Sequence, residues 1–232
     1  FKMAGDDILL DVIHDFILPS FEKALQTAGV RAPAALMSRL CGEESVSIQD
    51  AILRQQLNLQ VFTPLGLALL KAYESHDPEA TQETLTYSYK DLLANDSVKD
   101  PVWQYVNGAV RREVAGLGLF DILAVPINFD LGQLHKSFLE NRINLTKILA
   151  ALCEVIFHYP CDVLLLTGRP SRLPGVQAFI RMMLPLPPGR IQPMHNYRTG
   201  GWYPFHKSGL INDPKSTASV GAMLFLMCTN RS

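Results

Sequence analysis

The sequence predicts an α/β protein whose first half is mostly helical. Apolar residues recur at helical spacing over about the first hundred residues, whereas after residue 119 short apolar runs alternate with helical segments. An alternation of strands and helices favours parallel pairing of the strands. The chain has 232 residues, 48% apolar and 19% charged, which is typical of a folded protein. We therefore expect a mostly helical subdomain over 1–118 and an α/β subdomain over 119–232.

The first predicted helix has apolar positions at helical spacing over Ile8–Ile17 and again over Phe21–Ala28. Asp6-Asp7 offers a cap at its start, and Gly29 should stop it. Pro19 should interrupt it only mildly.

The later elements follow from the same periodicities. They are one or two helices over 48–74, broken near Thr63-Pro64; a loop-rich segment with a short helix over 75–100; a strand over 120–129; a helix over 138–156; a strand over 163–166; a helix over 176–183; a proline-rich connection over 185–193; and a Gly/aromatic stretch over 197–204. The last helix should be capped by Asp213 and begin at Pro214.

Composition excludes several classes of function. The net charge is -1, so we expect neither a nucleic acid nor an anionic membrane as partner. The longest strongly apolar run, Val163–Leu166, is far too short to span a bilayer. The four cysteines and six histidines match no usual metal spacing, and we expect buried free thiols. Because the chain starts at Phe1, we expect it to be a piece of a longer protein.

The segment richest in chemical groups is Asp162–Gln177, which contains Gly-Arg-Pro-Ser-Arg between a predicted strand and a predicted helix. Gly168 permits a turn that a side chain would forbid, and Ser171 can cap the helix. Arg169 and Arg172 can stack on a base or bind a phosphate. On pattern alone, an ordinary strand–loop–helix connection with surface arginines is the simpler alternative.

A second segment, Asn212–Ala222, combines a capped helix start with small residues that would let the helix pack closely. Alone it is an ordinary helix. Together, however, the two segments resemble the second lobe of the actin-like ATPase superfamily, particularly the DnaK-type chaperones. The pieces that carry this resemblance are Ala4–Asp7, Val125–Ile127, Leu165–Gly168, Ser171–Pro174, Asp213-Pro214 and Gly221-Ala222.

The resemblance implies an incomplete actin-like (ribonuclease H-like) lobe with an inserted, mostly helical subdomain. It also implies an adenosine loop in which Gly168, Arg169, Ser171 and Arg172 bind the nucleotide, ATP with Mg. Arg169 and Pro170 replace a glycine and a serine of the family pattern, which would narrow the approach to the α-phosphate.

A closer resemblance is to the carboxy-terminal part of the SrfB family, large bacterial proteins described as virulence factors. Its motifs here are AGDDILLDVIHDFILPSF, LLLTGRPSRLPGVQ, LPLPPGRI, GGWYPF and DPKSTASVGAM. This resemblance implies a bacterial cytoplasmic protein, with export still open.

The phosphate loops of the superfamily are absent from this sequence, which has neither Asp-x-Gly-Thr nor Asp-Gly-Gly-Gly-Thr. We expect this chain to supply only the adenosine side of an ATP site, with an upstream lobe of its full-length chain as partner, and to be inactive alone. The alternative is a degenerate lobe that serves as a non-catalytic scaffold. Four aromatic residues, Tyr197, Trp202, Tyr203 and Phe205, either pack on the last helix or contact a protein partner.

Overall fold

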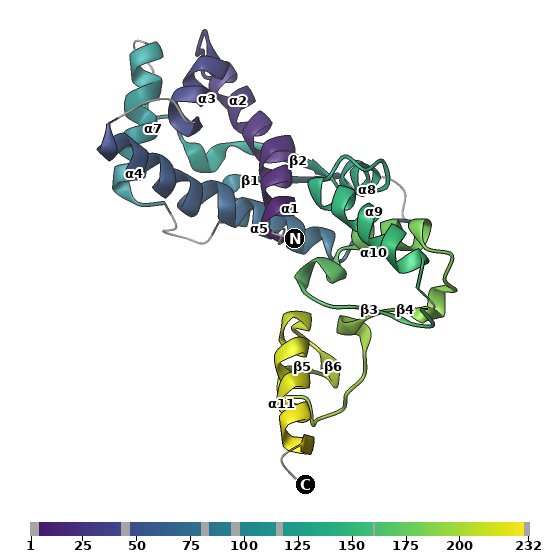
Figure 1. Cartoon of the computed structure of the whole chain (residues 1–232). Coiled ribbons are helices and arrows are strands. Elements are labelled where there is room, and N and C mark those ends of the chain that lie inside the picture. The colour runs from purple at the N-terminus through teal and green to yellow at the C-terminus, as the bar shows by residue number, and fades with distance from the viewer. Residues whose placement is uncertain are drawn as a thin grey trace. The chain divides into compact units, whose positions relative to one another are not determined.

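The computed structural model describes residues 5–42, 47–79, 84–93, 98–114, 118–159 and 161–229 (Figure 1). These residues form two compact units. One, here the helical unit, comprises 8–72 and 81–131; the other, the mixed unit, comprises 1–7, 73–80 and 132–232. The predicted subdomain boundary lies beside residues 115–117, which are outside the described residues, and it stays a prediction.

Helices dominate the first part of the chain, as the sequence predicts. The elements up to residue 130 are α1 Gly5–Val12, α2 Leu18–Thr27, α3 Pro33–Cys41, α4 Ile48–Leu57, α5 Thr63–Tyr73, β1 Thr84–Ser88, α6 Tyr89–Leu92, α7 Asp100–Glu113 and β2 Pro126–Asp130. Gly29, just beyond α2, has φ +93°, the left-handed conformation that ends a helix.

Two five-residue π turns join helices that would otherwise be separate. Ile13–Ile17 joins α1 to α2, and Asn58–Phe62 joins α4 to α5. In each, the next residue donates its N–H to the carbonyl five residues back, Leu18 to Ile13 and Thr63 to Asn58. A proline follows at once in both places, Pro19 and Pro64. Because a proline lacks an N–H and its ring clashes with the carbonyl four residues back, a wider turn lets the helix continue. The expected break near Thr63-Pro64 is therefore wrong.

The helical unit also contains an antiparallel pair, β1 with β2, in which Thr84 lies opposite Asp130 and Ser88 opposite Pro126. The sequence predicts a loop-rich segment with a short helix where β1 lies, because residues 75–100 are polar and contain a break at Asp77-Pro78. The expected strand over 120–129 is shorter, since a 3₁₀ turn at Ile122–Ala124 precedes β2. The inward residue Phe129 meets Phe16 edge-on at 4.8 Å between ring centroids.

The remaining elements are α8 Leu131–Leu139, α9 Asn144–Phe157, β3 Leu164–Leu166, α10 Pro174–Met183, β4 Ile191–Pro193, β5 His206–Lys207, β6 Leu210–Ile211 and α11 Thr217–Thr229. The helix expected over 138–156 is confirmed from Asn144 onward as α9, but its predicted start is wrong, because α8 ends at Leu139 and Asn141 adopts φ +58° before α9 begins.

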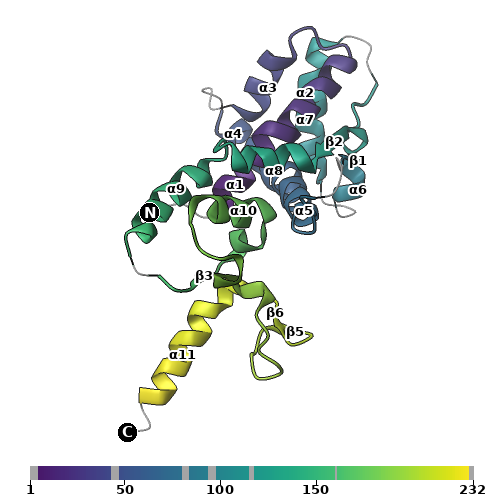
Figure 2. The same cartoon turned by 90° about the vertical axis from the view of Figure 1, so that its right-hand side faces the viewer.

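Strand β3 confirms the strand predicted over 163–166, although it is one residue shorter. It pairs in parallel with β4, with Leu164 opposite Ile191, and β4 lies within the predicted proline-rich connection. Figure 2 shows the hairpin β5–β6 beside α11, where Tyr203, Ile211 and Val220 form a small buried cluster. The actin-like fold stays a prediction.

Candidate functional site

The predicted adenosine loop begins at Gly168, whose backbone has φ +80° and ψ 163°. This conformation strains any residue with a side chain. A 3₁₀ turn over Arg169–Arg172 follows. Ser171 is buried, and its hydroxyl donates to the Gly168 carbonyl at 2.7 Å. It therefore does not cap α10: the N-cap is Leu173, which makes no side-chain cap bond. The expected cap is wrong because the 3₁₀ turn directs the Ser171 hydroxyl toward the Gly168 carbonyl and away from the start of α10.

The loop is hydrogen-bonded to the segment that begins the last helix. The Thr167 hydroxyl donates to the Pro214 carbonyl at 2.7 Å and bonds the Thr217 hydroxyl, and the Gly168 N–H donates to the same carbonyl at 3.4 Å. Asp213 caps a 3₁₀ turn over Pro214–Ser216 by accepting from the Lys215 N–H at 3.1 Å, which confirms it as a cap. The helix itself begins at Thr217, three residues later than predicted. The structure thus brings together the two segments on which the resemblance depends.

The two arginines of the loop have different environments. Arg172 Nε lies 2.9 Å from Glu74 Oε2, and Arg172 Nη1 donates to the Asn212 carbonyl at 2.8 Å. The Arg172 side chain keeps 33% of its surface exposed. Arg169, in contrast, is exposed at the start of the 3₁₀ turn. Arg172 is therefore the better ordered of the two cations.

Tyr73, a residue of the mixed unit, lies against the start of α10. A Cβ at Gly175 would lie 2.4 Å from the Phe138 ring and 2.6 Å from the Tyr73 hydroxyl oxygen, so this approach requires glycine. Tyr73 stacks on Phe138 at 5.8 Å, and its hydroxyl lies 2.9 Å from His135 Nδ1. Burial raises the pKa of Tyr73, so its phenol stays protonated. Tyr73 and Glu74, neighbours in sequence, thus contact Gly175 and Arg172, at and just after the C-terminal end of the candidate loop.

Two histidines of the mixed unit have lowered pKa values. Burial is the larger cause for His135, followed by the charge of His76. Burial is also the larger cause for His195, followed by the charge of Arg172. Nδ1 of His195 is buried and has no hydrogen-bond partner among the described residues. His195 is therefore a neutral ring beside the candidate loop at neutral pH.

Sequence reasoning missed Glu74, Tyr73 and His195 as neighbours of the loop. These residues contact the loop from distant segments of the chain, so neither their residue types nor their spacing predicts the contact. Only the folded structure brings them next to the loop. The turn at Gly168 could be predicted because a glycine before a helix is a local feature, and its φ of +80° confirms the turn. The nucleotide-binding roles of Gly168 and Arg172 stay predictions.

The aromatic residues of the Gly/aromatic stretch divide into two groups. Tyr203 is buried, and its hydroxyl lies 2.7 Å from the Ser216 hydroxyl, so it packs at the start of the last helix. Tyr197, Trp202 and Phe205 are 49%, 59% and 53% exposed. Those three side chains are free to contact a partner.

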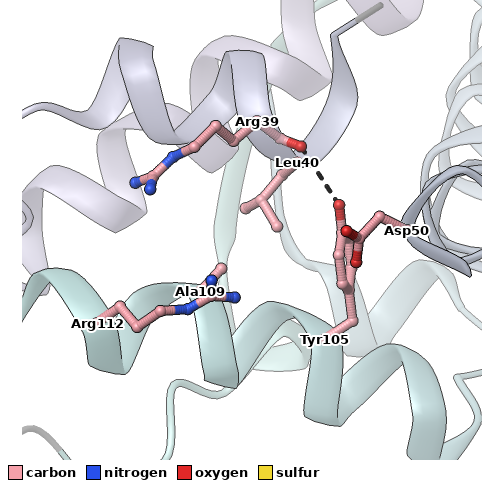
Figure 3. Close-up of a pocket in the computed structure, with 6 residues that line it drawn as sticks. All are labelled: Arg39, Leu40, Asp50, Tyr105, Ala109 and Arg112. Atoms are coloured by element: carbon pink, nitrogen blue, oxygen red, sulfur yellow. Dashed lines mark hydrogen bonds between the residues drawn. The ribbon is translucent and has the colours of Figure 1, made fainter. Parts of the chain in front are cut away.

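A pocket in the helical unit is a second place where polar groups converge (Figure 3). It is lined by Arg39, Leu40, Asp50, Tyr105, Ala109 and Arg112. The Tyr105 hydroxyl donates to the Arg39 carbonyl at 3.3 Å, and the Arg39 guanidinium pairs with Glu113. Arg112 donates to the Gly108 carbonyl of its own helix. Since these contacts already satisfy its polar groups, the pocket is a weaker candidate than the loop.

The cysteines are free thiols, and of the four only Cys153 is buried, so the expectation of buried thiols is wrong for Cys41 and Cys228. Among the described residues, no three His, Cys, Asp or Glu side chains gather as a metal site. None of the helices in the described part of the chain is both long and apolar enough to cross a membrane.

Comparison with known proteins identifies the family. The family described as Virulence factor SrfB matches residues 1–232, so the chain belongs to the SrfB family. No curated protein and no solved structure matches the chain.

Proposed function

We propose that this chain supplies the adenosine side of an ATP site in the full-length SrfB protein. The observation that carries the proposal is the loop Thr167–Arg172, which is hydrogen-bonded to the start of the last helix and opens on a glycine with positive φ. A tight turn between a strand and a helix lets a backbone approach a nucleotide closely. Arg172, anchored beside this turn and partly exposed, offers a cationic plane on which a base can stack.

The phosphate groups and Mg would be bound by another part of the full-length protein, because the sequence printed here contains no aspartate-bearing phosphate loop. This chain alone is then expected to be inactive. Whether the full-length protein hydrolyses ATP depends on that other part.

The proposed partner is the upstream lobe of the same full-length chain. Helix α11 has no charged residue, and only Val220 among its 13 residues is buried. Strand β3 belongs to a parallel pair, yet Leu165 is 57% exposed. Uniformly apolar helices and parallel strands are normally covered. These two surfaces are therefore suited to packing against a further lobe.

A second candidate function is a degenerate lobe that acts as a non-catalytic scaffold. The observation that favours it is Arg169, a long side chain where the superfamily pattern has a glycine. The exposed aromatic residues Tyr197, Trp202 and Phe205 would then serve as the contact surface for a protein partner.

The experiment that separates the two functions is calorimetry of the full-length protein with ATP and Mg²⁺. We expect binding, and a loss of about tenfold or more in affinity for Arg172→Ala, because the stacking plane is removed. Arg142→Ala is the control, since Arg142 is exposed and pairs with Glu140 instead. Absence of binding heat in the unmodified protein would contradict the ATP site and favour the scaffold.

A further inference from the structure

The guanidinium group of Arg172 is held by one ion pair and one hydrogen bond. Nε lies 2.9 Å from Glu74 Oε2, and Nη1 donates to the Asn212 carbonyl at 2.8 Å. The contact with Glu74 is electrostatic, since Arg172 Nε makes no hydrogen bond to the described residues. Together, the ion pair and the Nη1 bond restrict where the guanidinium lies, while 33% of the Arg172 side chain stays exposed and available for stacking on a base.

Glu74 is well placed to hold this guanidinium in position. It follows directly after Tyr73, whose ring is buried against Phe138 and whose hydroxyl approaches Gly175. The backbone that carries Glu74 is thereby anchored next to the loop. The Glu74 side chain is 28% exposed, so its pair with Arg172 is less screened than a fully solvated pair. The pair joins the end of α5 to the candidate loop.

We propose that Glu74 is a positioning residue, which holds the guanidinium group of Arg172 in place for stacking on the base of a bound adenine nucleotide. This inference rests on the proposed function. Without the carboxylate, Arg172 regains rotamer freedom in the free protein, and binding must then order it at an entropic cost. Glu74 itself does not touch the ligand.

The test uses the full-length protein with two probes, Mg²⁺-ATP and adenosine, which lacks phosphates. We expect Glu74→Gln to weaken the binding of both probes about tenfold, because the defect lies at the base. Glu74→Asp, which keeps the charge, should recover most of the affinity. Asp162→Asn is the matched control: it removes the same charge from the Asp162–Arg190 pair at 3.1 Å, where Asp162 is 93% exposed.

The outcomes separate the inference from the proposed function. Equal affinity of the unmodified protein and Glu74→Gln for both probes overturns the positioning role alone, and so does a loss confined to ATP, which indicates a charge effect on the phosphates. No binding of either probe to the unmodified protein overturns the ATP site and, with it, the role of Glu74.

A second measurement needs no nucleotide. Nuclear magnetic relaxation of the Arg172 Nε–H, assigned by comparison with Arg172→Lys, should show an ordered group in the unmodified protein and a mobile one in Glu74→Gln. A mobile Nε–H in the unmodified protein overturns the positioning role even if ATP binds. Thermal melting of Glu74→Gln checks that the variant is folded.

Discussion

At the scale of single residues, the close packing of the Phe138 ring against Gly175 reverses the usual preference of a helix for alanine over glycine. Alanine normally stabilises a helix relative to glycine by about 1 kcal/mol. At Gly175 a Cβ would meet the Phe138 ring at 2.4 Å. We expect Gly175→Ala to lower the free energy of unfolding by about 1–3 kcal/mol, because both rings around it must move. Urea unfolding of the two proteins measures the change.

Gly221 is the control for this prediction. It lies in α11, and a Cβ there would meet nothing within 4 Å. We expect Gly221→Ala to raise the unfolding free energy by about 0.5–1 kcal/mol or to leave it unchanged. If both glycine variants were stabilised equally, the tight contact at Gly175 would be contradicted.

Part of the candidate site can be read from the sequence and part cannot. Gly168 was predicted because its role is set by its own backbone. The cap expected from Ser171 is wrong because an intervening 3₁₀ turn gives its hydroxyl a nearer acceptor, the Gly168 carbonyl. The Glu74–Arg172 pair could not be predicted, since it depends on where α5 ends relative to the loop.

At the scale of elements, the first π turn is supported from outside its own helix. Tyr89 is fully buried, and its hydroxyl donates to the Ile17 carbonyl at 3.0 Å and lies 2.7 Å from the Ser20 hydroxyl. We expect Tyr89→Phe to lower the unfolding free energy by about 1–2 kcal/mol, because a buried hydrogen bond is lost without a replacement.

The comparison for that prediction is Tyr105→Phe. The Tyr105 hydroxyl makes a longer and exposed bond, 3.3 Å to the Arg39 carbonyl. Water replaces such a bond easily, so the change should stay within about 0.5 kcal/mol. Thermal melts of both variants give the two values, and similar losses would contradict the structural importance of Tyr89.

The long helices could be predicted because their apolar positions repeat over several turns, as in the segment from Ile8 to Ala28. The strands were harder. The short apolar run of β3 predicts a strand, whereas β1 lies in a polar segment whose pattern predicts a loop. Strand β4 lies between prolines and carries no alternating pattern. Elements this short depend on their partners more than on their own sequence.

Helix α11 yields a prediction about association. Phe225 and Leu226 are 68% and 58% exposed on a helix without charges. We expect Phe225→Glu to make this chain more soluble without changing its circular dichroism, because an exposed apolar surface promotes aggregation. The control is Leu10→Glu, since Leu10 is 58% exposed on α1. An equal gain from both variants would show that α11 has no special role in association.

At the scale of the whole molecule, stability should depend on pH through His135 and His195, whose pKa values are lowered in the folded state. The unfolded histidines bind protons near pH 6.5, before the folded ones do. The contribution of the two neutral histidines to the free energy of unfolding should therefore be fully present above pH 6.5. It should be lost progressively as the pH falls below 6.5. Urea unfolding at pH 7.5 and pH 5.5 measures the loss.

Replacing both histidines by glutamine should make the unfolding free energy less dependent on pH over this interval. His14→Gln is the control, because the His14 side chain is 81% exposed. A pH dependence that survives in the double variant would assign the effect to other groups.

The two π turns have a consequence for comparing sequences of this family. Each contains one residue more than a regular helical turn, so it is a place where the helix has room for an insertion. Removal of one residue there, with replacement of the proline that follows by a residue with an N–H, would restore an ordinary helix. A gap of one residue at 13–17 or 58–62 in an alignment therefore need not signal a different fold, whereas the same gap inside α2 or α5 would rotate every later side chain out of the core.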